Sequence, residues 1–184
     1  IMRANTVLEH LDNGVITDND LKNRMKGELE FLRGFYHFTL LRFFGGVPVI
    51  TKTLSAEEAL GVPRNSVSEV YSSVISDFED AISLLPDNPS EVGKVTKDVA
   101  RGLLASVYLT RSAPKNGIDG PGQESNDYNK VIELVNQITP RPWVANYADI
   151  FSYVNENNTD ILFDVELINQ IGMGSSYPGD LLGE

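Results

Sequence analysis

The chain has 184 residues, of which 41% are hydrophobic, and its 15 basic and 26 acidic side chains give a net charge of −11. This acidity argues against a nucleic-acid partner, because the phosphates would be repelled. The absence of cysteine excludes disulfides, thiolate metal sites and a cysteine nucleophile. No apolar run approaches the ~20 residues that cross a bilayer, so we expect a globular piece without a membrane span.

Hydrophobic periodicity predicts two helices at the start of the chain. The first runs from about Ile1 to Leu11, and the second begins with Thr17 or Asp18 as its N-cap and ends at Phe44. Apolar residues cover most of the circumference of the second helix, so we expect it to lie at the centre of the fold. The side chains that we expect to be largely inaccessible are Phe31, Leu32, Phe35, Tyr36 and Leu40.

Glycines, a proline and a charged residue define the second helix further. Gly45 and Gly46 can adopt the left-handed backbone of a helix C-cap, and Pro48 prevents the helix from continuing. A loop over residues 45–65 should follow. Arg33 is a cation within the apolar stretch, and an unpaired buried charge is very unfavourable. We therefore expect Arg33 to pair with a carboxylate or with carbonyl groups at a helix end.

Three more helices are predicted after this loop. Ser66 and Glu69 form a capping box that begins the third helix, in which the two side chains satisfy backbone donors. Thr96 is the expected N-cap of the fourth helix. The fifth helix follows a loop over residues 112–126 and ends before Pro140.

The fourth and fifth helices fit the residue spacing of a tetratricopeptide hairpin, apart from a longer connection. The residues that fit are Leu104, Ala105 and Tyr108, then Tyr128, Val131, Val135 and Ile138. The second and third helices would form the neighbouring hairpin. We therefore expect a mainly α fold of helical-hairpin repeats with long loop insertions over about residues 1–140. A loop region over residues 141–184 should follow, with one short β-strand at Ile161–Ile168.

One block of the second helix carries a family resemblance. The pattern Glu-x-x-Phe-Leu-Arg-x-Phe-Tyr spans Glu28 to Tyr36, and Arg-Phe-Phe-Gly-Gly-Val-Pro spans Arg42 to Pro48. This block resembles the signature of the SusD/RagB family, surface lipoproteins with which certain Gram-negative bacteria capture glycans. That family is built on tetratricopeptide-like repeats with long insertions.

The resemblance implies a function and a location. It implies non-catalytic capture of oligosaccharides on the outer face of the outer membrane, and their transfer to a SusC-like TonB-dependent transporter. The chain would be one piece, residues 1–184, of a larger SusD-like domain. The signal peptide and the lipid-bearing cysteine that anchors the protein would then lie upstream of Ile1.

Sugar binding needs aromatic faces that stack on pyranose rings, and polar groups that bond their alcohols. Aromatic residues on the predicted helices are better explained as core. Those after the fifth helix are expected to cap the repeat by packing on it; they are Trp143, Tyr147 and Phe151. Tyr177 lies instead in a glycine-rich loop beside Ser175 and Ser176, and we take these three residues as the candidate ligand site.

Two other classes of function stay open from the residues. One is an intracellular helical-repeat module that binds another protein. The other is an enzyme of the glycosidase type, which needs a pair of carboxylates. Asp164 and Glu166 share one face of the predicted strand and are the best such pair. Asp77, Glu79 and Asp80 point in different directions on the third helix, and we expect them mostly on its solvated side.

The residues predict neither a cofactor nor a metal site. His10 and His37 have no histidine, cysteine or close acidic pair in ligand spacing. The polar run from Asn155 to Asp160 offers oxygens for calcium, but it lacks the glycine and the distal glutamate of an EF-hand loop. Calcium binding therefore stays an open question at this point.

Overall fold

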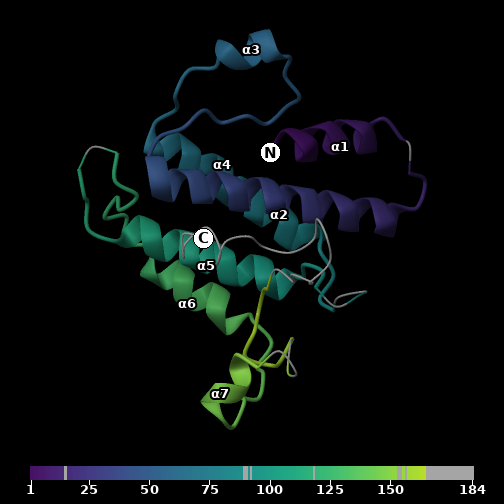
Figure 1. The fold of residues 1–184 in the computed structure, drawn as a ribbon, viewed down its shortest axis with the longest axis vertical. Helices are drawn as coiled ribbons and strands as arrows, with labels where there is room; N and C mark the ends of the chain where they lie inside the picture. Colours follow the sequence, from purple (N-terminus) through teal and green to yellow (C-terminus); the bar gives the residue numbers. More distant parts are fainter. Residues whose placement is uncertain are drawn as a thin grey trace, which may run out of the picture.

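The computed structural model describes residues 1–14, 16–88, 91, 93–117, 119–152, 155 and 157–164. This part of the chain is mainly helical and contains no strand (Figure 1). Its helices are α1 (Met2–Asp12), α2 (Asn19–Phe44), α3 (Ala56–Leu60), α4 (Val67–Leu84), α5 (Lys97–Ser112), α6 (Tyr128–Asn136) and α7 (Tyr147–Ile150). None of these helices is both long and apolar enough to span a bilayer.

Local sequence signals set the ends of the main helices as predicted. Asp18 caps α2 by accepting hydrogen bonds from two backbone N–H groups of its first turn. Gly45 ends α2 in a backbone with φ of 70°, which glycine adopts without strain. Ser66 and Glu69 form the capping box of α4, and the Thr96 hydroxyl accepts a backbone hydrogen bond at the start of α5.

The core lies between α2, α4 and α5, with α1 against α2 and α6 against α5 (Figure 1). Phe31 of α2 and Phe78 of α4 meet edge to face with ring centroids 5.6 Å apart, and both are fully buried. A glycine allows α2 to approach α4 this closely, because a Cβ atom at Gly34 would lie 3.0 Å from the Cβ of Asp77. The helix pair therefore depends on a small residue at the crossing.

The cation of α2 is paired inside this core. Arg33 Nη2 lies 2.6 Å from Asp77 Oδ1, and Arg33 Nε donates to both Asp77 oxygens at 3.1 Å. Arg33 Nη1 also donates to Asn5 Oδ1 at 3.3 Å, which ties α1 to the pair. The expected pairing of Arg33 is confirmed, whereas the solvated side predicted for Asp77 is wrong. Burial raises the pKa of Asp77, and the hydrogen bonds from Arg33 oppose this effect.

The predicted burial of α2 is correct for one side of the helix only. Phe31 is buried, and Phe35 and Leu40 are partly buried. Leu32 is 37% exposed and Tyr36 is 50% exposed, so the expectation that they are inaccessible is wrong. Apolar residues surround α2, but the helices that pack against it leave the side chains of Leu32 and Tyr36 partly exposed.

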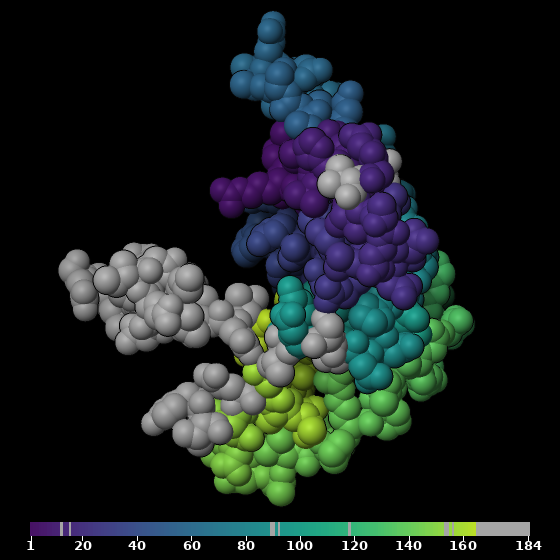
Figure 2. Space-filling model, turned by 90° about the vertical axis from the view of Figure 1, so that its right-hand side faces the viewer, coloured from purple at the N-terminus to yellow at the C-terminus, as the bar shows by residue number. Residues whose placement is uncertain are grey.

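Two short helices lie where loops were expected. Ser55 and Glu58 form a second capping box, which begins α3 within residues 45–65. Figure 2 shows α3 standing clear of the main body, and none of its residues is buried. At the other end of the molecule, Asn146 caps α7.

One expectation about the region after α6 is not met, and a second is not confirmed. Trp143 is 87% exposed, and Tyr147 and Phe151 pair edge to face at 5.2 Å while both stay exposed. The prediction that these three aromatic residues pack on the repeat is therefore wrong. They lie in or beside the four-residue helix α7, and a helix of a single turn offers little surface for packing. Residues 161–164 form no strand, and the rest of the predicted strand lies outside the described residues.

Candidate functional site

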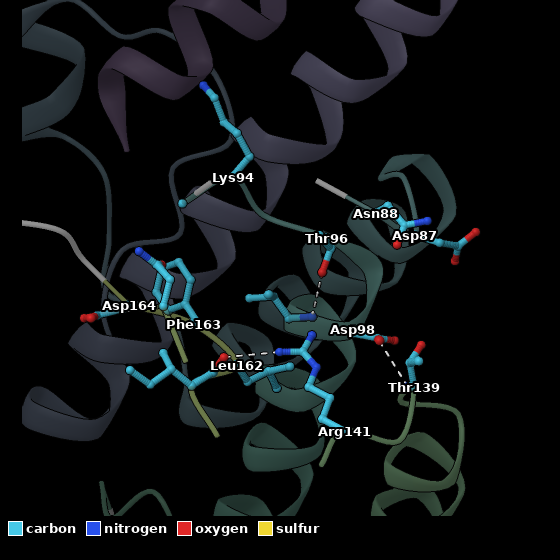
Figure 3. Close-up of a pocket in the computed structure, with 14 residues that line it drawn as sticks. Asp87, Asn88, Lys94, Thr96, Asp98, Thr139, Arg141, Leu162, Phe163 and Asp164 are labelled. Carbon is cyan, nitrogen blue, oxygen red and sulfur yellow. Dashed lines mark hydrogen bonds between the residues drawn. The ribbon is translucent and has the colours of Figure 1, made fainter. Parts of the chain in front are cut away.

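A cleft of about 340 Å³ lies where the start of α5 meets the segments that follow α6 (Figure 3). It lies within the range of ~300–1,000 Å³ that is usual for small-molecule sites. Most of its lining side chains are polar, and the apolar ones are Val99, Ile161, Leu162 and Phe163. The labelled residues are Asp87, Asn88, Lys94, Thr96, Asp98, Thr139, Arg141, Leu162, Phe163 and Asp164.

Asp98 connects the start of α5 with the segment after α6. Its Oδ2 accepts a hydrogen bond from the backbone N–H of Thr139 at 3.1 Å, which holds the segment after α6 against the start of α5. Its Oδ1 accepts from Arg101 Nη1 at 3.0 Å. Burial alone would raise the pKa of Asp98, but the hydrogen bonds from Thr139 and Arg101 hold it below its ordinary value. Asp98 is therefore an ionised structural bridge and is not available as a proton donor at neutral pH.

Arg141 and Asp160 take part in two hydrogen bonds that connect the segment after α6 with residues 160–161. Arg141 Nη1 donates to the carbonyl oxygen of Ile161 at 3.2 Å. The backbone N–H of Val144 donates to Asp160 Oδ2 at 3.2 Å. These two bonds connect residues 20 and 16 apart in sequence, and they hold residues 160–161 beside the segment after α6.

The apolar wall depends on a close approach to α5. A Cβ atom at Gly102 would lie 2.5 Å from the Cδ2 atom of Leu162, so a larger residue would force the Leu162 side chain to shift. Phe163 packs edge to face on Phe31 and Phe35 of α2, with ring centroids 5.5 and 6.1 Å apart. The cleft is thus anchored both to α5 and to the central helix.

The charges in the cleft are not all neutralised. Asp87 pairs with Lys97 at 3.7 Å, and Asp98 pairs with Arg101. Lys94 and Arg141 have no carboxylate within ion-pair distance in the described part of the chain. Together with hydroxyl and amide groups, these cations can donate several hydrogen bonds to a polar ligand. The arrangement suits binding of a polyhydroxylated molecule.

The residues that were predicted as functional fall in different places. Asp164 lines the cleft and is exposed. Tyr177, Ser175, Ser176 and Glu166 lie outside the described residues, so their roles stay predictions. Neither Arg141 nor Thr139 was singled out from the sequence. Their spacing from Asp98 carries no local signal that could have indicated a shared site.

The residues considered for metal binding are used in other ways. His37 is buried, and its Nε2 accepts a hydrogen bond from Ile50 N–H at 3.4 Å, while His10 is exposed. The amide of Asn158 donates to the carbonyl oxygens of Ile150 and Asn155 at 3.1 Å, so it stabilises its own loop. Within the described ranges, no group of three or more histidine, aspartate or glutamate residues is placed to hold an ion.

Comparison with known families places this chain. A SusD-like family model, described as starch-binding and associating with the outer membrane, matches residues 1–109. The chain belongs to the SusD-like family. It is 25% identical over 173 residues to a SusD-like protein of Formosa agariphila, with 93% of this chain and 31% of that relative covered. It is also 27% identical over 185 residues to one of Bacteroides ovatus, covering 87% of the chain and 33% of the relative.

Solved SusD-like structures share the fold. A laminarin-binding SusD-like protein superposes with a TM-score of 0.78 at 27% identity, covering 94% of this chain and 36% of that one. A structure with a xylogluco-oligosaccharide gives a TM-score of 0.74 at 26% identity, covering 91% of this chain and 33% of that one. The chain therefore spans about a third of the length of the relatives that it matches.

Proposed function

We propose that this protein captures oligosaccharides on the bacterial cell surface, without breaking bonds, and delivers them to a SusC-like TonB-dependent transporter. The match of residues 1–109 to a family described as starch-binding and associating with the outer membrane carries this proposal. One similar structure is of a laminarin-binding SusD-like protein and another contains a xylogluco-oligosaccharide, and these are the first ligands to test. A lipid anchor upstream of Ile1 would attach the protein to the outer membrane.

The cleft beside α5 supports the proposal through its chemistry. Sugar hydroxyls are both donors and acceptors, and the cleft offers donors from Arg141 and Lys94 and acceptors from Asp164. Trp143, two residues beyond Arg141, exposes an aromatic face of the kind that stacks on a pyranose ring. Tyr177, Ser175 and Ser176 are proposed to add a second platform with two hydroxyl groups.

The finer architecture belongs to the same proposal. We infer that α2 with α4 and α5 with α6 are two tetratricopeptide-like hairpins, because each pair packs together and successive pairs adjoin through α4 and α5. The helical core would cover about residues 1–140 of a larger domain, and residues 161–168 would form a strand in the whole protein.

Membership in the family favours this function over its two rivals. An intracellular repeat module would not need an association with the outer membrane, which the family description includes. Hydrolysis would need Asp164 and Glu166 to converge on one sugar bond. Release of reducing sugar by the wild-type protein that disappears in an Asp164→Asn variant would favour the enzyme. We expect no release of reducing sugar from the wild type or from the variant.

Calorimetry on the full-length protein tests the proposal. Arg141→Ala should weaken binding of laminarin or a xylogluco-oligosaccharide by about tenfold, which corresponds to the loss of a hydrogen bond from a charged donor. Lys115→Ala is the matched control, because it removes an exposed cation outside the cleft. Equal affinities for the Arg141→Ala variant and the wild type would remove the cleft from the binding site.

The aromatic residues allow a second test. Trp143→Ala and Tyr177→Ala should each weaken glycan binding by about tenfold or less, because stacking contributes on the order of 1 kcal/mol beyond buried area. The melting temperature should stay nearly unchanged in both variants. Affinity loss that is accompanied by unfolding would assign a structural role to the residue concerned.

A further inference from the structure

The segment between α6 and α7 carries two of the residues that we propose to bind the glycan. Residues 139–143 have the sequence Thr-Pro-Arg-Pro-Trp, in which Arg141 lines the cleft and Trp143 exposes its ring. All five residues are exposed and lie outside any helix. Burial therefore contributes little to holding them, and the segment depends on hydrogen bonds for its position.

Two prolines stiffen this segment. Pro140 and Pro142 each fix their own φ at about −65°, and each also restricts the backbone of the residue before it. The residues before them are Thr139 and Arg141, so the backbone is restricted at every position from 139 to 142. A stiff segment that is held at Thr139 therefore also holds Arg141 and Trp143 in place.

Asp98, in the first turn of α5, is the anchor at Thr139 (Figure 3). Asp98 is 4% exposed, and its Oδ2 accepts the hydrogen bond from Thr139 N–H at 3.1 Å. Its other oxygen accepts from Arg101 Nη1 at 3.0 Å, and this same nitrogen donates to the carbonyl oxygen of Gln137 at 3.3 Å. Asp98 thus cannot rotate without losing a bond, and hydrogen bonds to a carboxylate are stronger than those between neutral groups.

The other hydrogen bond of residues 139–143 leads to a part of the chain that is itself outside any helix. Arg141 Nη1 donates to the carbonyl oxygen of Ile161 at 3.2 Å, and residues 160–161 belong to no helix. Among the hydrogen bonds within the described part of the chain, the one from Thr139 to Asp98 ties residues 139–143 to a long helix. The position of the segment relative to α5 therefore depends on Asp98.

We propose that Asp98 is a positioning residue for glycan binding: through the N–H group of Thr139 it places Arg141 and Trp143 at the cleft. Protein groups occupy both of its own oxygens, so it acts on the glycan through this segment. The inference rests on the proposed function, because it concerns the affinity for the same ligand. It adds a residue whose removal should weaken binding although Arg141 and Trp143 are both still present.

Calorimetry and amide hydrogen exchange on the full-length protein test this role. Asp98→Ala should weaken binding of laminarin or a xylogluco-oligosaccharide by about tenfold, as Arg141→Ala does. Backbone amides of residues 137–144 should exchange about tenfold faster in this variant, because the segment opens more often. Asp98→Asn keeps an oxygen that accepts from Thr139 N–H, so its affinity should stay within about threefold of the wild type.

Asp127→Ala is the matched control for a general loss of stability. Asp127 accepts a hydrogen bond from Arg111 Nε at 2.8 Å near the other end of α5, so its removal also breaks an ion pair of this helix. It makes no hydrogen bond to residues 139–143 among those that the structure describes. Glycan affinity and exchange over residues 137–144 should therefore be the same as in the wild type.

A triple variant shows whether Asp98 acts through the two residues that it positions. When Arg141→Ala and Trp143→Ala are already present, adding Asp98→Ala should change the glycan affinity by less than about twofold. A further tenfold loss in that background would overturn the positioning role, because the effect would then not pass through Arg141 and Trp143.

Three other results would also be decisive. Wild-type affinity in Asp98→Ala, or an equal loss of affinity in Asp127→Ala, would overturn the positioning role alone. A wild-type protein that binds neither glycan would instead overturn the proposed function. If Asp98→Ala does not fold, exchange at the Thr139 amide of the wild type decides, and a rate as fast as that of an unstructured peptide would overturn the anchor at Asp98.

Discussion

The α2–α4 core and the region after α5 use aromatic side chains in opposite ways. Phe31, Tyr71 and Phe78 are fully buried between the long helices, whereas Trp143 and Tyr147 stand exposed beside the short helix α7. Both regions are rich in aromatic residues, so composition does not distinguish them. The two regions differ in the length of their helices, since α2 has 26 residues and packs along a long facing helix, whereas α7 has four residues.

The difference shows that the length of a helix and the presence of a facing helix together determine whether its aromatic side chains are buried. A helix of a single turn cannot offer a face that a neighbour can cover, and most helix stability in proteins comes from such packing. Substitutions in the core should therefore change stability strongly, and substitutions around α7 should change it little.

Phe31→Ala should have the largest effect on stability. It removes a fully buried ring that contacts Phe78, Phe35 and Phe163, and it leaves a cavity. We expect a loss of about 3–5 kcal/mol in the free energy of unfolding, measured by urea denaturation. A loss below ~1 kcal/mol would contradict the central position of α2.

Asp77→Ala should follow, at about 3 kcal/mol, because it leaves the Arg33 guanidinium partly buried without its carboxylate. The double variant with Arg33→Met and Asp77→Leu should recover most of this loss, since it removes both charges and keeps apolar volume. Unfolding experiments on the single and double variants measure the coupling. If the single and the double variant lose equal free energy of unfolding, the unpaired charge of Arg33 is not the cause of the loss.

Gly34→Ala should have an intermediate effect of about 1 kcal/mol. The new methyl group would lie 3.0 Å from the Cβ of Asp77, and the strain should exceed the gain in helix propensity. Thermal unfolding can be compared with Ser72→Ala, an exposed position of α4. A Gly34→Ala variant that is more stable than the wild type would show that the helix crossing can relax.

Trp143→Ser should have the smallest effect, within about 0.5 kcal/mol, because the ring buries little surface. Melting temperatures of the variant and the wild type provide the measurement. A loss of more than ~1 kcal/mol would mean that the indole packs on the fold, as the sequence had suggested.

The sequence predicted those parts of the fold that depend on neighbouring residues. Asp18, Gly45, Ser66 and Thr96 mark helix ends because a cap acts within one turn of chain. The motif from Glu28 to Pro48 identified the family for a similar reason, since its pattern is contiguous. The need for a partner at Arg33 also followed from the cost of a lone buried charge.

Only the tertiary structure decided which surfaces are covered and which residues meet. Periodicity placed apolar residues on all sides of α2, but the position of α4 buries Phe31 and leaves Tyr36 half exposed. Asp77 became the partner of Arg33, and Asp98 met Thr139, across 44 and 41 residues of sequence. Such long-range contacts depend on how helices cross, and the crossing is set by the close approach at Gly34 rather than by any local preference.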